Sequence, residues 1–402
     1  MALVSLDTGL SETDVERRDT AHRFAAEVMR PIGRELDRIA APADVIAPGS
    51  PLWEAFERYR QLGLDETAEP DPETDPAHEA LVSAIVSEEL GWGDAGLAIS
   101  FGVSNFHKLF ARTSGDEELI DRFCDPARPE IGCWAVTEPD HGSDVLSFTE
   151  RHFREPALHA NCIARRDGND FVITGQKSAW VSNGTIAEAA ALFCSVDMGD
   201  GPVGGGVFVV PLNEGGVTKG KPTDKIGQRA LNQGEIFFND LHVPADALVV
   251  PPEGYRAAAD RVLCLANASM GTTFVGCARA AFELATDYAK ARVQGGVAIF
   301  AHQSMKSRLF KMYQKVEAAR ALNHRVVRIN AARAAPLLEL AIASKVTSTQ
   351  AAFDVASDAL QVFGGAGISR DCPIEKIFRD ARISMIEDGC NEVLGMVAAA
   401  RF

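Results

Sequence analysis

Two short segments of the chain bring together hydroxyls, turn-forming residues and an aromatic ring. The first, WAVTEPDHGSD at residues 134–144, places Thr137, Ser143 and several turn N–H groups in one loop. Such donors suit ring carbonyls or a pyrophosphate, although this segment alone fits an ordinary polar turn equally well. The second, GQKSAWVSNG at residues 175–184, puts Trp180 and Ser182 on the same face of an expected strand. Because an indole stacks on a flat ring and a hydroxyl bonds its edge nitrogen, the pair predicts a planar cofactor.

Two neighbouring acids near the C-terminus are candidates for proton transfer. Glu387 and Asp388 stand in the run IEDGCNE at residues 386–392. A carboxylate can take a carbon-bound proton when a nearby carbonyl stabilises the charge that develops. The structural alternative is that both acids only cap the last helix.

The elements that must position these residues follow from the hydrophobic periodicity. Phe24, Val28, Ile32 and Leu36 recur every four residues in the first part of the chain, as in helices, and an acidic, proline-bearing loop at residues 69–75 interrupts that pattern. From about residue 130 to 251 the sequence changes to short β-rich runs between Gly, Asp and Asn turns. The clearest runs are FVIT at 171–174, ALFC at 191–194, GVFVV at 206–210 and IFF at 236–238.

Helical periodicity returns from residue 257 onward. Met270, Phe274, Cys277 and Ala281 step by four and three, and similar stripes begin at Met305 and at Phe353. Stripes this regular are typical of a bundle core. We therefore predict an α+β fold with an N-terminal α-helical domain (1–129), a central β-barrel-like or sandwich domain (130–251) and a C-terminal four-helix bundle (252–402).

Composition excludes several functional classes. The 402 residues are 46% hydrophobic and carry a formal net charge of −16, which disfavours nucleic-acid and anionic-membrane surfaces. No apolar run approaches the length of a membrane span, and residues 1–12 do not resemble a signal peptide, so we expect a cytoplasmic protein without membrane insertion. The eight cysteines form no C-x-x-C pair. Reduced thiols are expected, rather than disulfides or a metal site.

Together, the two cofactor segments resemble the flavin signatures of the acyl-CoA dehydrogenase family, approximately TEPxAGSD and GxKxWITNG. This chain has one extra residue between Lys177 and Trp180, so the second match runs from Trp180 onward. Further segments resemble the family in the same order. They are GQR at 227–229, IFFxDxxVP at 236–244, RxQGG at 292–296, HQ at 302–303, QxxGG at 361–365 and EKxxRDA at 375–381. The resemblance extends from about residue 12 to 402.

The resemblance implies that the cofactor is FAD. It assigns the isoalloxazine and ribityl region to Trp134, Val136, Thr137, Gly142, Ser143, Trp180, Val181 and Ser182. It assigns contacts with the FAD of a neighbouring subunit to Arg292, Gln294, Gln361, Gly364 and Gly365. The other predicted cofactor residues are His302, Gln303, Cys390 and Glu392. A shared cofactor implies an oligomer, a homotetramer or homodimer, whereas the simpler reading of Arg292 is a surface salt bridge.

The same resemblance orders the two acids. The family run IYEGTSE places Glu387 on the tyrosine and Asp388 on the catalytic glutamate, so we predict Asp388 as the base and keep Glu387 as the alternative. Ser143, Asn267 and Gly389 are the predicted substrate contacts. Asn267 stands where many members have an arginine that helps to bind CoA, which leaves an acyl-carrier-protein thioester open as the substrate.

The implied activity is α,β-desaturation of an acyl-CoA in acid catabolism, with electrons passed to an electron-transfer flavoprotein. An oxidase or monooxygenase of the same fold is the alternative, because nitroalkane oxidase also has an aspartate base, in an FDGGN context. That enzyme's arginine seven residues after the base corresponds to Gly395 here. A non-catalytic flavin scaffold is disfavoured, since Trp180, Ser182 and a carboxylate at position 388 are all present.

Overall fold

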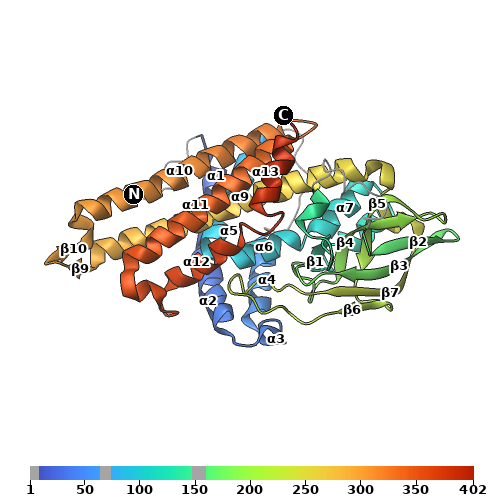
Figure 1. Cartoon of the computed structure of the whole chain (residues 1–402), viewed down its shortest axis with the longest axis horizontal. Helices are drawn as coiled ribbons and strands as arrows, with labels where there is room; N and C mark the ends of the chain where they lie inside the picture. Colours follow the sequence, from blue (N-terminus) through green and yellow to red (C-terminus); the bar gives the residue numbers. More distant parts are fainter. Residues whose placement is uncertain (1–8, 64–73, 147–159) are drawn as a thin grey trace.

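The computed structural model describes residues 9–63, 74–146 and 160–402, and these form a helical part, a β-sheet domain and a second helical part in chain order (Figure 1). Residues 69–73 of the acidic loop lie outside the described residues, and Asp75 caps the helix that follows by accepting a bond from the Ala77 amide. The N-terminal helices are α1 (Glu12–Phe24), α2 (Arg30–Arg38), α3 (Pro42–Val45), α4 (Pro51–Gln61), α5 (Pro76–Gly93), α6 (Ala95–Val103), α7 (Phe106–Ser114) and α8 (Glu117–Phe123).

The four-residue repeat of the N-terminal part is the buried face of one nearly continuous helix. Ser11 and Asp14 form a capping box at the start of α1, and a π-helical turn at Ala25–Met29 joins α1 to α2. Phe24, Ile32 and Leu36 are buried against α4 and α6. The predicted helical periodicity is confirmed.

The β domain is built on one sheet with the order β6-β7-β3-β2-β4-β5-β8, to which β1 adds by pairing with β4. The four predicted runs lie in β3, β4, β5 and β7, and hydrophobic side chains on one face of the sheet form its core. The strands are β1 (Gly132–Ala135), β2 (Ile163–Asp167), β3 (Asp170–Lys177), β4 (Ala189–Asp197), β5 (Pro202–Pro211), β6 (Val217–Lys219), β7 (Ile236–Val243) and β8 (Leu248–Val250).

Three long helices dominate the C-terminal part within the described residues. They are α9 (Pro252–Ala291), α10 (Gln303–Ala331) and α11 (Leu338–Phe363), followed by the shorter α12 (Pro373–Ile383) and α13 (Asn391–Ala399). Met270 and Phe274 of α9 pack with Met312 of α10 and Val355 of α11 in a shared core, as their spacing predicted. Helix α5 of the N-terminal part packs against α9 and α10 and so joins this bundle.

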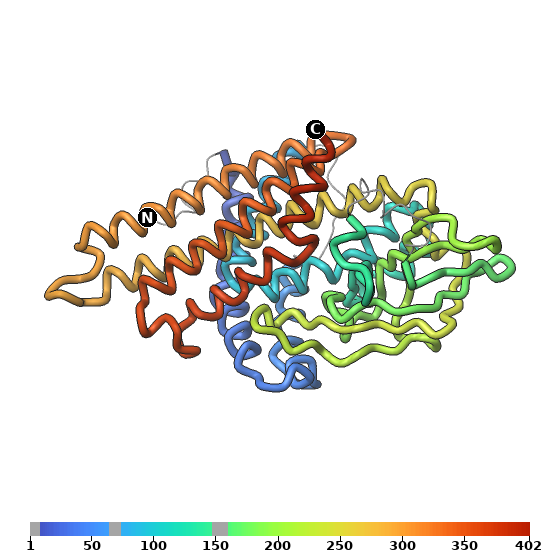
Figure 2. Tube along the Cα trace, in the orientation of Figure 1, coloured from blue at the N-terminus to red at the C-terminus, as the bar shows by residue number. Residues whose placement is uncertain are grey.

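Two connections matter for the site. The short hairpin of β9 (Val293–Gln294) and β10 (Val297–Ala298) lies at one end of the longest axis, and the β sheet lies toward the other (Figure 1). The loop between β6 and β7 leaves the sheet and reaches the C-terminal helices beside α12 (Figure 2). None of the described helices has the length and apolar character needed to cross a membrane.

Candidate active site

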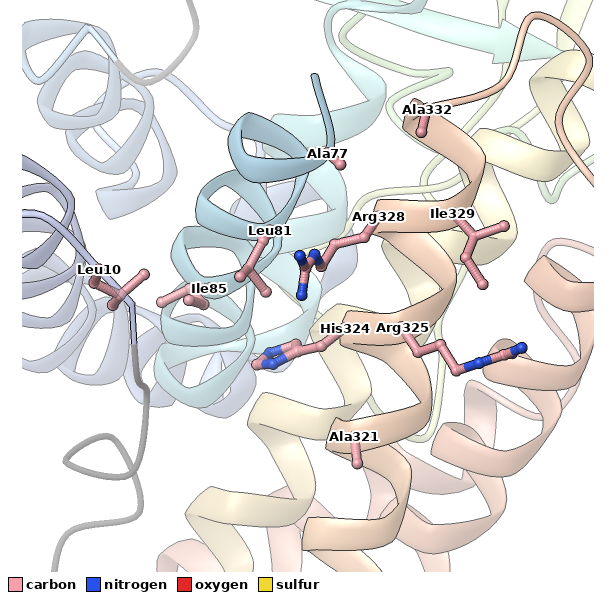
Figure 3. A pocket seen from close by; sticks show the side chains of 10 residues that line it. All are labelled: Leu10, Ala77, Leu81, Ile85, Ala321, His324, Arg325, Arg328, Ile329 and Ala332. Atoms are coloured by element: carbon pink, nitrogen blue, oxygen red, sulfur yellow. The ribbon is translucent and has the colours of Figure 1, made fainter. Parts of the chain in front are cut away.

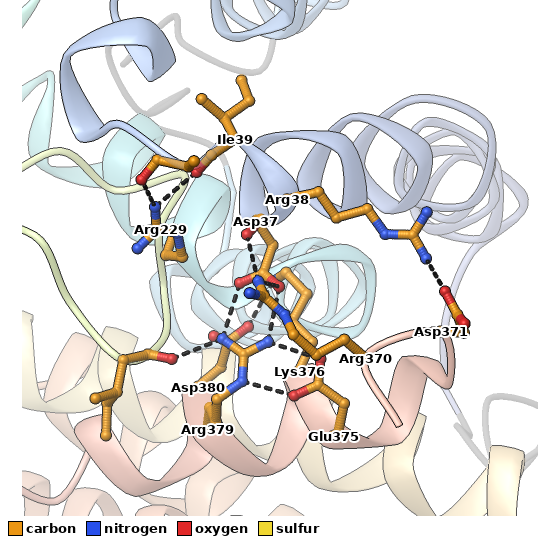
Figure 4. Close-up of polar contacts among 12 residues, drawn as sticks. Asp37, Arg38, Ile39, Arg229, Arg370, Asp371, Glu375, Lys376, Arg379 and Asp380 are labelled. Carbon is orange, nitrogen blue, oxygen red and sulfur yellow. Dashed lines mark hydrogen bonds and ion pairs between the residues drawn. The ribbon is translucent and has the colours of Figure 1, made fainter. Parts of the chain in front are cut away.

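Helix α12 is fixed before it leads into the two acids. Arg379 forms an ion pair with Asp37 of α2 at 2.7 Å and another with Glu375, and Lys376 lies 2.6 Å from Asp380 (Figure 4). Lys376 also lies 2.6 Å from Asp94. Each of these charges has an oppositely charged partner, so burying them leaves no isolated ion. The segment after α12 therefore begins from a rigid support.

A tight turn between α12 and α13 carries Glu387 and Asp388, and we call residues 386–391 the base turn. Asp388 has φ +50° and Gly389 has φ +92°, so the chain reverses through the left-handed region. The Cys390 amide donates to Ser143 Oγ at 3.0 Å, which ties the turn to the loop after β1. Lys345 Nζ of α11 donates to the Gly389 carbonyl at 2.8 Å and to Asn391 Oδ1 at 2.9 Å.

The two acids have different surroundings. Glu387 Oε2 accepts a bond from Gln228 Nε2 at 2.9 Å, and its other oxygen is sealed from solvent without a partner. Burial raises the pKa of Glu387 to about 7, against the opposing charge of Lys225. The Asp388 carboxyl makes no hydrogen bond within the described part of the chain, and the residue is half-buried. Burial raises the pKa of Asp388, and the charge of Lys345 opposes that rise.

The two cofactor segments meet at a pair of hydroxyls. Thr137 Oγ1 lies 2.9 Å from Ser178 Oγ, and the Ser178 amide donates to the Thr137 carbonyl at 2.9 Å. Below them Lys177, completely buried at the end of β3, pairs with Glu138 at 2.6 Å. Sequence comparison could not place Lys177 reliably, because of the extra residue beside it. The structure shows that it joins the two segments from beneath.

Trp180 and Ser182 lie in a loop, so the expectation of a strand at these positions is wrong. Strand β3 ends at Lys177, and Asn183 takes φ +60°, with its amide buried against Ser100 and the Gly132 carbonyl. This left-handed residue turns the chain out of the sheet. Gln233 Nε2 then bonds both the Trp180 carbonyl and Ser182 Oγ, so the two residues still lie together, and Trp180 is 61% exposed.

These groups fit the ring of a flavin. Trp180 offers an uncovered indole surface beside fixed hydroxyls, and Trp134 is half-buried with an Nε1 that has no partner. Val136 and Val181 are partly or fully buried next to them, and Gly142 is exposed. The donor set is suited to ring edges and carbonyls, as proposed from sequence.

A second group of predicted cofactor residues lies elsewhere. Arg292, Gln294, His302 and Gln303 are exposed on or beside the β9–β10 hairpin, and His302 Nε2 contacts the Gln294 carbonyl at 3.1 Å. Arg292 forms no ion pair with any described residue, so the salt-bridge reading receives no support. The last three members are also exposed, on α11 and the turn after it: Gln361, Gly364 and Gly365. In one chain the β9–β10 hairpin lies at the opposite end of the longest axis from the β sheet, whose strand β3 leads into the loop of Trp180 (Figure 1).

The remaining predicted residues surround the base turn. Asn267 of α9 is completely buried, and its amide donates to the Leu263 carbonyl at 2.9 Å and, at 3.5 Å, toward the Asp388 carbonyl. Its side chain thus faces the turn rather than solvent. Gly389 packs against Leu394, Cys390 precedes α13, and Glu392 is exposed in the first turn of α13.

A cavity of about 600 Å³ between α5 and α10 is separate from these groups. His324 and Arg328 point across it toward α5, whereas Arg325 points away (Figure 3). Leu81 and Ile85 form part of its apolar wall, and no predicted catalytic or cofactor residue lines it.

Sequence reasoning missed several residues of the site. Lys345, Gln228 and Gln233 contact the base turn or the Trp180 loop, yet none belongs to the predicted set. One signal was available for Lys345, because a lysine at a core position of an apolar helical stripe must be paired or functional.

Comparison with known proteins identifies the family. Residues 133–241 match the model of the acyl-CoA dehydrogenase middle domain, and residues 253–402 match that of the acyl-CoA dehydrogenase C-terminal domain. The short-chain specific acyl-CoA dehydrogenase of Sus scrofa mitochondria is 28% identical over 395 residues, which cover 97% of this chain and 90% of that protein.

Solved structures agree over the full length. Butyryl-CoA dehydrogenase from Megasphaera elsdenii superimposes with a TM-score of 0.83 at 25% identity, covering 98% of this chain and 99% of that one. A Mycobacterium smegmatis glutaryl-CoA dehydrogenase in complex with FADH2 has the same fold, with a TM-score of 0.84 at 21% identity over 99% of this chain and 96% of that one. The chain belongs to the acyl-CoA dehydrogenase family of FAD-dependent oxidoreductases.

Proposed function

We propose that this protein binds FAD and introduces an α,β double bond into an acyl-CoA thioester, with Asp388 as the catalytic base. One observation carries the choice of base: within the described residues the Asp388 carboxyl has no hydrogen-bond partner, whereas the Glu387 carboxyl is bonded to Gln228 and its other oxygen is sealed from solvent. A base must reach the proton that it takes, so geometry favours Asp388.

Bound FAD would supply the acceptor for the hydride that leaves the β-carbon. Thr137 and Ser182 would bond the edges of its ring, and Trp180 would cover one face. Asp388 would take the α-proton of the substrate. Aspartate is one methylene shorter than the usual glutamate, about 1.5 Å, so the acyl chain must lie correspondingly closer to the base turn.

The second part of the cofactor site would come from a neighbouring subunit. Arg292 is exposed, unpaired within the described chain and next to the β9–β10 hairpin, which lies at the opposite end of the longest axis from the β sheet (Figure 1). A guanidinium is suited to a pyrophosphate, and the Gly364–Gly365 turn would allow close backbone approach. We propose a homotetramer or homodimer, and an electron-transfer flavoprotein as the acceptor of the electrons.

The test is an anaerobic titration of the FAD-loaded protein with straight-chain, branched and cyclic acyl-CoAs, followed by loss of the oxidised flavin absorbance. At least one member should bleach the flavin of the wild type. Asp388→Asn should bind FAD normally and bleach about 10²- to 10⁴-fold more slowly, the usual contribution of a positioned base. Glu387→Gln is the matched control and should retain most of the rate.

Other results would redirect the proposal. If Asp388→Asn reduces flavin as fast as the wild type, Asp388 is not the base. If the whole panel leaves the wild-type flavin oxidised, the same panel on carrier-protein thioesters, and then on nitroalkanes, distinguishes the remaining substrates. Reoxidation faster by oxygen than by an electron-transfer flavoprotein would indicate an oxidase.

A further inference from the structure

The buried ammonium group of Lys345 supports the base turn from the protein interior. Lys345 of α11 is completely buried, and its Nζ reaches the Gly389 carbonyl and Asn391 Oδ1. Asn391 Nδ2 donates at 3.1 Å to Oγ1 of Thr349, which lies one helical turn further along α11. The residue after Asp388 and the first residue of α13 are therefore both fixed to α11.

An ammonium in this position is costly unless a negative charge compensates it. Removing an ion from water costs several kcal/mol, and two neutral acceptors offset only part of that cost. Lys345 forms no direct ion pair within the described residues. Burial lowers the pKa of Lys345 to about 8. Among the neighbouring charges that oppose this lowering, that of Asp388 has the largest effect.

The groups whose charge most strongly raises the pKa of Lys345 come from the base turn and the start of α13. They are Asp388, Glu387, Cys390 and Glu392. Glu387 is bonded to Gln228 and its pKa is raised, and Glu392 is exposed, which weakens its field by solvent screening. Among the described residues, the side-chain hydrogen bond from α9 to the turn comes from the neutral amide of Asn267. The Asp388 carboxylate is the natural counter-charge of Lys345.

We propose that Lys345 is a positioning residue for the reaction: its hydrogen bonds hold the base turn, and its charge keeps Asp388 ionised and ready to take a proton. This inference rests on the proposed function. It also accounts for the presence of a lysine on the apolar stripe of α11, where Ile342, Thr349 and Ala352 are its buried neighbours.

The first experiment compares Lys345→Met with Thr349→Val in FAD-loaded enzyme. Flavin reduction is measured from pH 5.5 to 9 with an acyl-CoA that reduces the wild type. Without the lysine charge, the pKa of Asp388 should rise, so the limb of the pH–rate profile that reports Asp388 should move to higher pH by about one unit or more. The rate of flavin reduction should then fall about tenfold or more at low pH and recover toward high pH. Thr349→Val removes a contact to Asn391 but no charge, and its limb should not move.

A purely structural role would give a different profile. If Lys345→Met lowers the rate by the same factor at every pH, the charge has no part in tuning the base and the proposal is wrong. Lys345→Arg keeps the positive charge. If this variant folds, the limb of its pH–rate profile should coincide with that of the wild type.

A second measurement needs neither turnover nor a folded Lys345 variant. Coupling between two charges is reciprocal, so Asp388→Asn should lower the pKa of Lys345 further below its unfolded value. A lysine of lowered pKa makes stability rise with pH above its folded pKa. Thermal melts between pH 6.5 and 10 should show this rise beginning at lower pH in Asp388→Asn than in the wild type.

If wild type and Asp388→Asn show the same dependence of melting temperature on pH, Lys345 and Asp388 do not interact. The proposal would then be wrong even if thioester dehydrogenation were established. Conversely, a displaced profile with no flavin reduction by any acyl-CoA would support the Lys345–Asp388 coupling while overturning the assigned substrate.

Discussion

At the scale of single residues, Glu387 lies next to the proposed base, Asp388, but in different surroundings. Its Oε1 has no partner, and its Oε2 depends on Gln228, whose own backbone has φ +47° and whose amide nitrogen bonds Asp380. Two adjacent carboxylates repel one another when both are ionised. A raised pKa for Glu387 keeps it largely protonated below neutrality and leaves the charge to Asp388.

The raised pKa predicts a pH-dependent stability. The folded pKa of Glu387 is about 7, above the value of about 4.3 in an unfolded chain, so the native state binds an extra proton between these values. The resulting stability is complete below about pH 4.3 and is lost as pH rises through 7. Glu387→Gln cannot ionise, so its melting temperature should be higher than that of the wild type at pH 8. The expected gain in free energy of unfolding is on the order of a few kcal/mol.

The measurement is a pair of thermal melts of FAD-loaded wild type and Glu387→Gln, at pH 5.5 and pH 8. Asp240→Asn, on the exposed part of β7, is the control for a generic loss of charge. A difference between variant and wild type that is equal at both pH values would show that Glu387 is ionised throughout.

At the scale of elements, the Lys177–Glu138 pair joins β3 to the loop after β1, and it decides where both cofactor segments lie. Lys177 also donates to the Val136 carbonyl at 3.0 Å, and Glu138 accepts from the Cys162 amide at 3.2 Å. The pair is thus a crosslink among β1, β2 and β3. Removing one partner leaves the other as an unpaired buried charge, which costs about 3–5 kcal/mol.

Lys177→Met should therefore lower the melting temperature and weaken FAD binding together, because Thr137 and Ser178 sit directly above the pair. The double variant Lys177→Met with Glu138→Gln should recover part of the lost stability, since no unpaired charge remains. Equilibrium FAD binding and melting of the apoprotein measure the two effects. A Lys177→Met protein with unchanged FAD affinity would show that the crosslink does not position the cofactor segments.

The elements also show what the sequence could predict. Periodicity located the helices around Phe24 and Phe274 and the strands around Phe171 and Phe208, because burial on one face leaves a regular pattern. It failed at Trp180, because the turn depends on Asn183 and its distant partners Ser100 and Gly132. No local pattern encodes such contacts.

The candidate site divides in the same way. Asp388 is predicted as the base from its neighbours in sequence, since the motif around it has no gaps, and that assignment stays a prediction. The contacts that distinguish its surroundings from those of Glu387 come from Ser143, Gln228 and Lys345, which are 44 to 247 residues from their partners in the turn. The loop after β1, the loop between β6 and β7 and helix α11 supply these contacts, and only the folded chain brings them together.

At the scale of the whole molecule, the predicted cofactor residues form two groups separated along the longest axis (Figure 1). Thr137 follows β1 and Trp180 follows β3, whereas Arg292 lies at the end of α9 beside the β9–β10 hairpin. Val293 of the hairpin and Phe310 of α10 are exposed apolar residues. If both groups bind FAD, each site must combine two chains.

Complementation between two defective variants tests this arrangement. Arg292→Leu should weaken FAD binding about 10- to 100-fold through the loss of a charge-assisted bond, and Arg325→Leu, which changes an exposed arginine on α10, should not. Trp180→Ala should also bind FAD weakly.

In a hybrid dimer made of one Arg292→Leu chain and one Trp180→Ala chain, one site receives Trp180 from one chain and Arg292 from the other, and the second site receives neither. Random pairing in co-expressed dimers should then restore tight binding to about a quarter of the sites. If Arg292 instead contacts the FAD of its own chain, every hybrid site keeps one defect, and titration of the mixture with FAD will detect no tight sites.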